Sequence, residues 1–179
     1  MLEQFIQFAP GRTCVCIDAA NLESAAKDLD WHIDYRKLKS LFSSEKCIGL
    51  RHYCVRHGTA NQGAFFSFLK RAGFTLVTKP LKRIKADDPL EADLRKANFD
   101  VEIAVDAVAT MAQFDTLILF SGDSDFAYLI DFLRRRGKHV VVMSTRYHVA
   151  RELVERSSKY LDLRHLKPWI VRDSKAMNA

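Results

Sequence analysis

The sequence lacks the features that mark several classes of protein. Its 179 residues include only seven glycines and four prolines, too few for a collagen-like or low-complexity chain. No apolar stretch approaches the ~20 residues of a membrane-spanning helix. The N-terminal residues have no basic segment followed by a long apolar run, so we expect no signal peptide, a cytoplasmic location and no membrane contact. The composition, 48% hydrophobic and 28% charged, is typical of a soluble globular protein.

Cysteine is scarce too, and its spacing excludes most specialised roles. The chain has four cysteines, Cys14, Cys16, Cys47 and Cys54. No two of them form a pair that is matched by a second pair at zinc-finger spacing. The first two lie in an apolar run, so we expect buried free thiols rather than disulfides or a metal site.

Positive charge, by contrast, is in excess, because the formal net charge is +6. Two segments concentrate it: KPLKRIK at 79–85 holds four basic residues, and 164–179 holds four basic residues against one acidic one. Clustered lysines and arginines bind phosphates with release of counterions, so RNA or another polyanion is one candidate partner. Solvated loops have the same composition, so charge alone leaves both interpretations open.

Apolar runs alternate with helical patterns along nearly the whole chain. The runs predicted as strands are 13–18, 47–55, 74–79, 116–120, 139–143 and 160–163. The segments predicted as helices are 21–29, 35–42, 61–73, 99–112, 124–137 and 148–157. Most of the strands are apolar throughout rather than alternating, which is typical of a parallel sheet covered on both faces.

The fold class that follows is α/β, a three-layer sandwich with a mostly parallel sheet and helices on both faces. We expect a single domain over residues 1–179, with a core of about 12–165 and a basic C-terminal tail at 166–179. Residues 80–98 have the least regular pattern and are predicted to form a loop that carries function.

Aspartates end two of the apolar runs and begin two of the helices. Asp18 ends the run 13–18, and Asp123 follows the run 116–120 within the stretch SGDSDF at 121–126. In a parallel sheet, ligands bind outside the carboxyl ends of the strands. If these two strands are neighbours, ~4.8 Å apart, Asp18 and Asp123 point at one shared place. Asp125 lies at the mouth of the next helix, and Asp100 begins another helix that should face the same edge.

Four carboxylates around one place need compensation, because like charges that cannot be separated keep some of the groups protonated. A hard dication supplies it, since Mg²⁺ and Mn²⁺ take oxygen ligands and keep several waters. The sequence therefore predicts a site for Mg²⁺ or Mn²⁺. The alternative is helix capping, the commoner role of any single Asp at such a position. Only the convergence of several acids on one edge favours the metal.

The segments that carry these acids resemble a known family. DAAN at 18–21, FDVEIAVDAV at 99–108 and SGDSDF at 121–126 occur in this order and are similar to the NYN domain, in its LabA-like branch of the PIN-like nuclease superfamily. The resemblance spans roughly residues 12–165. It implies a Rossmann-like α/β fold and a metal-dependent ribonuclease, with Asp18, Asp100, Asp123 and Asp125 as the catalytic and metal-binding residues. The chain departs from the family pattern at KANFD (96–100), where many relatives have a glycine.

The function predicted on this basis is hydrolysis of single-stranded RNA. Asn21 and Ser121 would support the acids by hydrogen bonding. The residues that would hold the RNA backbone are Lys79, Lys82, Arg83, Lys85 and Arg146.

Other interpretations of the sequence are weaker or stay open. There is no GxxxxGK[ST] and no GxGxxG after a strand, which gives nucleotide cofactors no support. Tyr53 and His57 border the predicted edge and could stack on a base or pack against the adjoining helix. The alternative function is a non-catalytic module that binds RNA or protein on the same fold, and a third is a nuclease or phosphatase acting on DNA or small phosphates. Homo-oligomers fit each of these functions.

Overall fold

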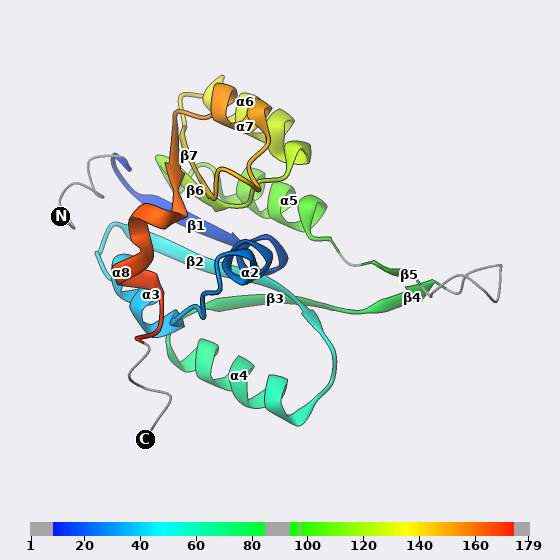
Figure 1. Ribbon diagram of the computed structural model, residues 1–179. Coiled ribbons are helices and arrows are strands. Elements are labelled where there is room, and N and C mark those ends of the chain that lie inside the picture. The colour runs from blue at the N-terminus through cyan, green and yellow to red at the C-terminus, as the bar shows by residue number, and fades with distance from the viewer. Residues whose placement is uncertain (1–8, 85–93, 97, 174–179) are drawn as a thin grey trace.

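The structure is a computed structural model that describes residues 9–84, 94–96 and 98–173. A six-stranded parallel sheet forms its centre, in the order β3-β2-β1-β6-β7-β8 (Figure 1). The strands of this sheet are β1 (Thr13–Asp18), β2 (Cys47–Arg56), β3 (Thr75–Pro80), β6 (Thr116–Phe120), β7 (His139–Ser144) and β8 (Lys159–Asp162).

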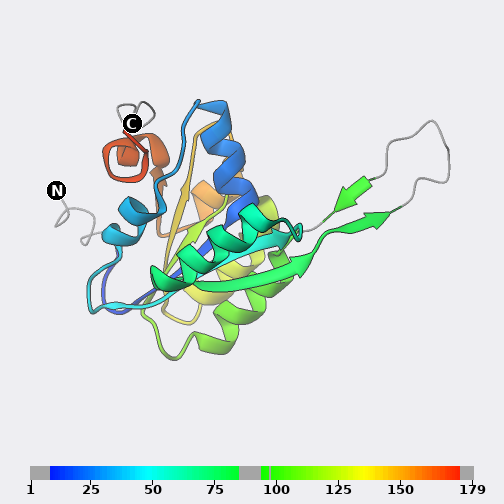
Figure 2. The ribbon, with the colours of Figure 1, turned by 90° about the horizontal axis from the view of Figure 1, so that it is seen from below.

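Helices connect these strands and cover both faces of the sheet. The α-helices are α2 (Ala19–Asp28), α3 (Tyr35–Leu41), α4 (Ala60–Arg71), α5 (Asp100–Thr110), α6 (Ala127–Arg134), α7 (Arg151–Arg156) and α8 (Lys167–Ile170). Two 3-10 helices, η1 (Ser124–Phe126) and η2 (Leu163–Leu166), precede α6 and α8. Figures 1 and 2 show α2, α3, α4 and α8 on one side of the sheet and α5, α6 and α7 on the other.

Alternate residues of each buried strand enter two separate cores. On β1, Val15 and Ile17 pack with one set of helices, whereas Cys14 and Cys16 pack with the other. A strand with apolar neighbours on both faces has to be apolar throughout, which is why its sequence shows no alternation. The predicted three-layer α/β fold with a parallel sheet is therefore confirmed. All four cysteines have free thiols; Cys14, Cys16 and Cys54 are buried and Cys47 is half-buried.

Residues 80–98, predicted as a loop, contain a small second sheet. Strands β4 (Lys82–Ile84) and β5 (Leu94–Lys96) pair antiparallel, with Arg83 opposite Arg95. They project from the body next to the start of α5 (Figures 1 and 2). Strands of three residues are too short for a periodic pattern, so the sequence could not indicate them.

The chain after β8 folds back onto the body. Ile170 of α8 is fully buried in the same core as Leu38 of α3. Beyond it, Val171 bridges Ile33, and the Lys37 ammonium donates to Asp173 at 2.9 Å. The residues up to Asp173 are thus part of the folded unit. Across the described residues, no helix combines the length and apolar character that crossing a bilayer requires.

Candidate metal centre

The site lies at the carboxyl ends of two central strands, β1 and β6. These strands are parallel neighbours, and Ile17 is paired with Phe120. Asp18 is therefore level with the residue after β6, and Ser121, Gly122 and Asp123 continue from that edge. The two strands are adjacent, which is the condition on which the convergence of the acids depended, and their adjacency brings Asp18 and the SGDSDF stretch to one place.

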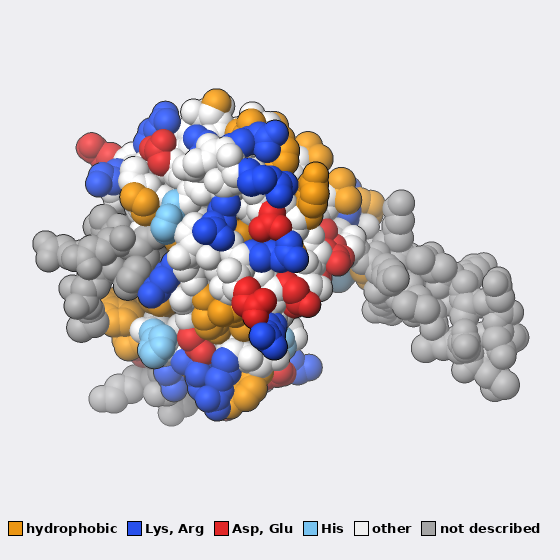
Figure 3. Space-filling view, turned by 90° about the horizontal axis from the view of Figure 1, so that it is seen from above, with side chains coloured by type: hydrophobic (Ala, Val, Ile, Leu, Met, Phe, Trp, Pro, Cys, Tyr) orange, Lys and Arg blue, Asp and Glu red, His pale blue; other side chains and the backbone are white. Residues whose placement is uncertain are grey.

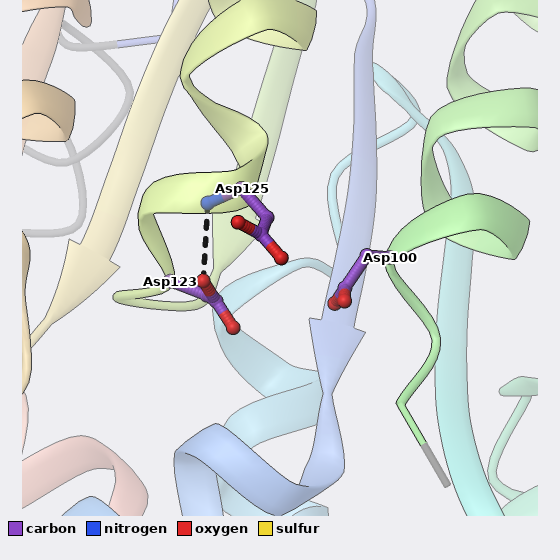
Figure 4. Close-up of side chains that lie close together, drawn as sticks. All are labelled: Asp100, Asp123 and Asp125. Atoms are coloured by element: carbon purple, nitrogen blue, oxygen red, sulfur yellow. Dashed lines mark hydrogen bonds between the residues drawn. The ribbon is translucent and has the colours of Figure 1, made fainter.

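Three carboxylates meet there from two distant segments of the chain. Asp100 begins α5, whereas Asp123 and Asp125 flank the start of η1. One oxygen from each of the three lies within 4.8 Å of the others. Figure 4 shows the three side chains around a common space, with a hydrogen bond of 3.0 Å from the Asp125 amide to Asp123 Oδ1. Asp100 and Asp123 are half-buried and Asp125 is exposed, so the group is open to solvent on one side.

Asp18 is not one of these three, and its carboxylate accepts hydrogen bonds from its neighbours. Oδ1 accepts from the amide of Ala20 at 3.1 Å, and Oδ2 accepts from the Asn21 side chain at 2.6 Å and from the Ser121 hydroxyl at 3.4 Å. The residue is only 5% exposed. Burial raises the pKa of Asp18, whereas the hydrogen bonds from Asn21, Ala20 and Ser121 act to lower it. Asp18 is therefore a buried neighbour of the group of three rather than a member of it.

Asn21 and Ser121, predicted as supporting residues, connect the ends of the two strands. The Asn21 side chain donates to Asp18 and accepts the amide of Gly122 at 3.2 Å through Oδ1. The Ser121 hydroxyl donates to Asp18 and accepts the amide of Asp123 at 3.2 Å. Each side chain thus bonds both β1's end and the loop after β6, which fixes the position of Asp123.

The electrostatic cost of the group falls on Asp100. Burial raises the pKa of this carboxyl to about 6, helped by the charges of Asp123, Asp18 and Asp125, while Lys79 acts in the opposite direction. Neighbouring side chains do little to relieve this, since among the described residues the side-chain donor to Asp100 is the uncharged Asn98, whose Nδ2 lies 2.6 Å from Oδ2. A bound dication would remove the repulsion.

Helix capping accounts for two of the four acids. Asp18 caps α2, and Asp123 caps η1 by accepting the amide of Asp125. Asp100 caps nothing, because the N-cap of α5 is Phe99 and no side chain bonds there. Capping therefore explains Asp18 and Asp123 in part, but it gives no reason for Asp100 to lie in the group.

Lys79, a predicted RNA-binding residue, lies close enough to Asp100 for its charge to act on that carboxyl. Its ammonium bonds Glu102 at 2.7 Å and lies 4.6 Å from the centre of the Phe99 ring. These contacts hold a cation beside the first turn of α5, two residues from Asp100. Among the other predicted contacts, Lys82 and Arg83 belong to β4, where only the backbone is described, and Lys85 lies outside the described residues.

Arg146 lies beyond the carboxyl end of β7, at the same edge of the sheet. Its side chain is exposed and lies over the Tyr147 ring, 4.6 Å from the ring centre, with a hydrogen bond to the Tyr147 hydroxyl. The guanidinium of Arg164 is 5.8 Å from the same ring. The exposed Arg146 and the half-buried Arg164, which is paired with Asp162, thus lie at this end of the edge, on the side away from Lys79.

Gly122 is the residue that sequence reasoning missed. A Cβ at this position would overlap the carbonyl oxygen of His148 and approach the Ser144 hydroxyl. The Gly122 carbonyl also accepts the amide of Ala150 at 2.9 Å. The loop 145–150 therefore lies directly against the SGDSDF backbone and holds Asp123 from the other side. The predicted helix 148–157 starts only at Arg151, and the pairing of Ala150 with Gly122 accounts for this. The glycine is visible in the sequence, but the contact that requires it is made by the distant loop 145–150.

Tyr53 and His57, left open between base stacking and packing, differ in the structure. Tyr53 is fully buried, and its hydroxyl donates to Asp106 at 2.9 Å. A ring with no exposed face cannot stack on a base, so Tyr53 is a packing residue. His57 is exposed, and its backbone amide donates to Gln62 at 2.6 Å.

Comparisons with known proteins agree with the geometry. The NYN domain family matches residues 12–164. The low amplitude and bright protein LabA of Synechococcus elongatus is 32% identical over 166 residues, which cover 91% of this chain and 89% of LabA. The crystal structure of a Vibrio parahaemolyticus protein of unknown function has a similar fold, with a TM-score of 0.71 and 22% identity over 86% of this chain and 93% of that one.

Proposed function

Since the chain belongs to the NYN domain family, in the LabA-like branch of the PIN-like nuclease superfamily, we propose that it is a metal-dependent endoribonuclease acting on single-stranded RNA. The observation that carries this proposal is the meeting of Asp100, Asp123 and Asp125, whose oxygens lie within 4.8 Å of one another at the carboxyl edge of the sheet. Acids of two separate segments come together there although their mutual repulsion opposes it.

The donor set fits a hard dication. All the donors of the group are carboxylate oxygens, the ligand type of Mg²⁺ and Mn²⁺ rather than of softer metals. The group is open on one side, which leaves room for water and a phosphodiester. We assign Asp100, Asp123 and Asp125 as the residues that hold the ion. When bound, the ion would lower the pKa of an attacking water and stabilise the developing charge on the phosphodiester.

The protein's own residues then position the acids and the RNA. Asp18 adds a fourth negative charge behind the group and, through Asn21 and Ser121, keeps the SGDSDF backbone in place. Lys79 and Arg146 lie towards opposite ends of the edge, on the β3 and β7 sides. Cations on both sides of an acidic site support a path for an RNA backbone across the edge.

The test is incubation of the purified protein with single-stranded RNA and single-stranded DNA in Mg²⁺, in Mn²⁺ or in EDTA. We expect RNA to be cut internally in either metal and to stay intact in EDTA, with little cutting of DNA. RNA that is bound but never cut would point instead to a non-catalytic RNA-binding module. Cutting of DNA in preference to RNA would refute the assigned substrate.

A further inference from the structure

One solvent-exposed surface of the protein, on α5 and α6, carries large apolar side chains. Seven large hydrophobic side chains are exposed in the described part of the chain, and four of them belong to α5 and α6. Tyr128 is 73% exposed, Val101 71% and Val105 59%, with Val108 beside them at 36%. In Figure 3 apolar side chains, coloured orange, form a row at the upper right of the molecule. Contiguous exposed apolar surface on a folded domain commonly marks a binding site.

Three of these side chains, Tyr128, Val105 and Val108, border a groove of about 480 Å³ between α5 and α6. Its apolar walls include Val105 and Val108 from α5 and Tyr128 and Phe132 from α6. Asp100 and Asp125, two of the three acids of the candidate metal centre, line the same groove. The groove is therefore an extension of the acidic site.

The spacing of residues along η1 and α6 determines the order in which their side chains line the groove. Asp125, Tyr128 and Phe132 are three and then four residues apart, so they share one side of the helical segment. Seven residues of helix span ~10 Å. At the far end the exposed guanidinium of Arg136 lies over the Phe132 ring, 3.5 Å from its centre. Along ~10 Å the groove thus presents carboxylates and then aromatic rings, and the Arg136 guanidinium lies beyond them against Phe132.

We propose that this groove binds the base of the RNA nucleotide next to the cleaved phosphodiester, with Tyr128 as its stacking residue; the inference rests on the proposed ribonuclease function. A nucleotide has a flat base with apolar faces, joined through its sugar to a charged phosphate. The groove likewise has apolar walls beside a site for a metal that binds phosphate. Arg136 is placed to meet the next phosphate of the strand.

The lining also determines what the groove distinguishes. Among the described residues that line the groove, the side-chain polar atoms are those of the two carboxylates and the Tyr128 hydroxyl. With the carboxylates at the metal end and a single hydroxyl along the apolar walls, the groove offers little that reads the hydrogen-bonding edges of a base. Stacking tolerates every base, because each has a π-face. The enzyme should therefore require a base at this position without selecting which one.

A second copy of the chain is the competing occupant, and the geometry disfavours it. A protein surface seated on Val105 and Tyr128 would also cover Asp100 and Asp125, because these acids line the same groove. Such a complex would close the acidic site to its substrate.

The test combines removal of the base with removal of the ring. The cleavage position is first mapped on a short single-stranded RNA, and oligonucleotides are then made that lack the base on the 5′ or the 3′ side of the cut. We expect one of the two base removals to raise KM of the wild-type protein about tenfold, the size expected when one base–aromatic stack is removed. Tyr128→Ala should raise KM for the intact RNA by a similar factor.

The decisive result is the combination of the two changes. Because both remove one interaction, Tyr128→Ala should show no further loss on the RNA that lacks the base. Tyr128→Phe keeps the ring and should behave as the wild type. Ile48→Ala, which truncates another exposed apolar side chain at the start of β2, is the matched control and should change nothing.

The outcomes separate this inference from the function on which it rests. A wild-type protein that neither binds nor cuts RNA would overturn both. If RNA is cut but neither Tyr128→Ala nor loss of the base changes KM, the groove does not bind a base, although the ribonuclease function stands. If Tyr128→Ala leaves KM unchanged but lowers the molecular mass measured by light scattering, the groove is a contact between copies of the chain.

Discussion

The burial of Asp100, together with the charges of the neighbouring acids, should be measurable in the metal-free protein as a pH-dependent loss of stability. The pKa of Asp100 is raised from its usual 3.8 to about 6 in the folded protein. Between these two values the folded state holds a proton that the unfolded state has released. Stability therefore falls as the pH rises from about 4 to about 6. Asp100→Asn carries no proton to lose and should escape this penalty.

The size of the effect follows from the shift and from the exposure of the group. The rise of the Asp100 pKa from 3.8 to about 6 corresponds to ~3 kcal/mol if it is fully expressed. Asp100 is only half-buried, so solvent screening reduces this to about 1 kcal/mol. The stability difference between Asp100→Asn and wild type should thus be near zero at pH 4 and reach about 1 kcal/mol, in favour of the variant, at pH 7.

Urea unfolding in EDTA at several pH values, followed by tryptophan fluorescence, measures this difference. His52 titrates in the same range with the opposite sign, because burial lowers its pKa to about 4 and stability is lost as the pH falls below about 6.5. Both proteins contain His52, so its contribution cancels in the difference. Adding Mg²⁺ at pH 7 should make the wild-type protein more stable than Asp100→Asn, because the wild type keeps all the carboxylates that bind the ion and binding stabilises the folded state.

A stability difference that does not change between pH 4 and pH 7 would refute the reasoning about Asp100. A wild-type protein that is more stable than Asp100→Asn at pH 7 in EDTA would do the same.

Two further predictions concern the support of the site and the approach of RNA. Gly122→Ala should destabilise the protein by about 1–3 kcal/mol in thermal or urea unfolding, because its Cβ would overlap the backbone of the loop 145–150. The control Gly63→Ala lies in a helix with open space around it and should instead stabilise the protein by ~0.5–1 kcal/mol. Equal effects of the two substitutions on stability would contradict the tight contact at Gly122. Replacing Lys82, Arg83 and Lys85 together with Ala should weaken RNA binding and reduce the log–log salt slope by about 0.7 for each phosphate that these side chains neutralise, whereas an unchanged slope would mean that this segment does not touch the RNA.

The layers of the fold could be predicted because both faces of the sheet are buried. Strands such as Thr13–Asp18 and Thr116–Phe120 then become continuous apolar runs, which the sequence displays directly. The sequence alone could not show that these two strands are neighbours, and the meeting of Asp18 with SGDSDF depended on that adjacency. The structure confirms the adjacency.

Other features depend on contacts between distant segments and leave no local pattern. The orientation of Asp18 is set by Asn21 and by Ser121, the latter 103 residues away, so its separation from the group of three could not be foreseen. The need for glycine at position 122 comes from the backbone of His148. The docking of α8 rests on the buried Ile170 and on Trp169 and Val171, which pack against the same core. A helix of four residues is too short to show a periodic pattern in the sequence.

The most direct test of the central claim is RNA cleavage by wild type and Asp123→Asn, side by side, in Mg²⁺, in Mn²⁺ and in EDTA. Asn caps a helix as well as Asp does, so the variant should fold normally and be at least as stable as wild type without metal. It has lost a carboxylate of the acidic group, so we expect it to cut no RNA in either metal, while wild type cuts RNA in both metals and not in EDTA. An Asp123→Asn protein that cuts RNA as fast as wild type, or wild-type cleavage that persists in EDTA, would contradict the account.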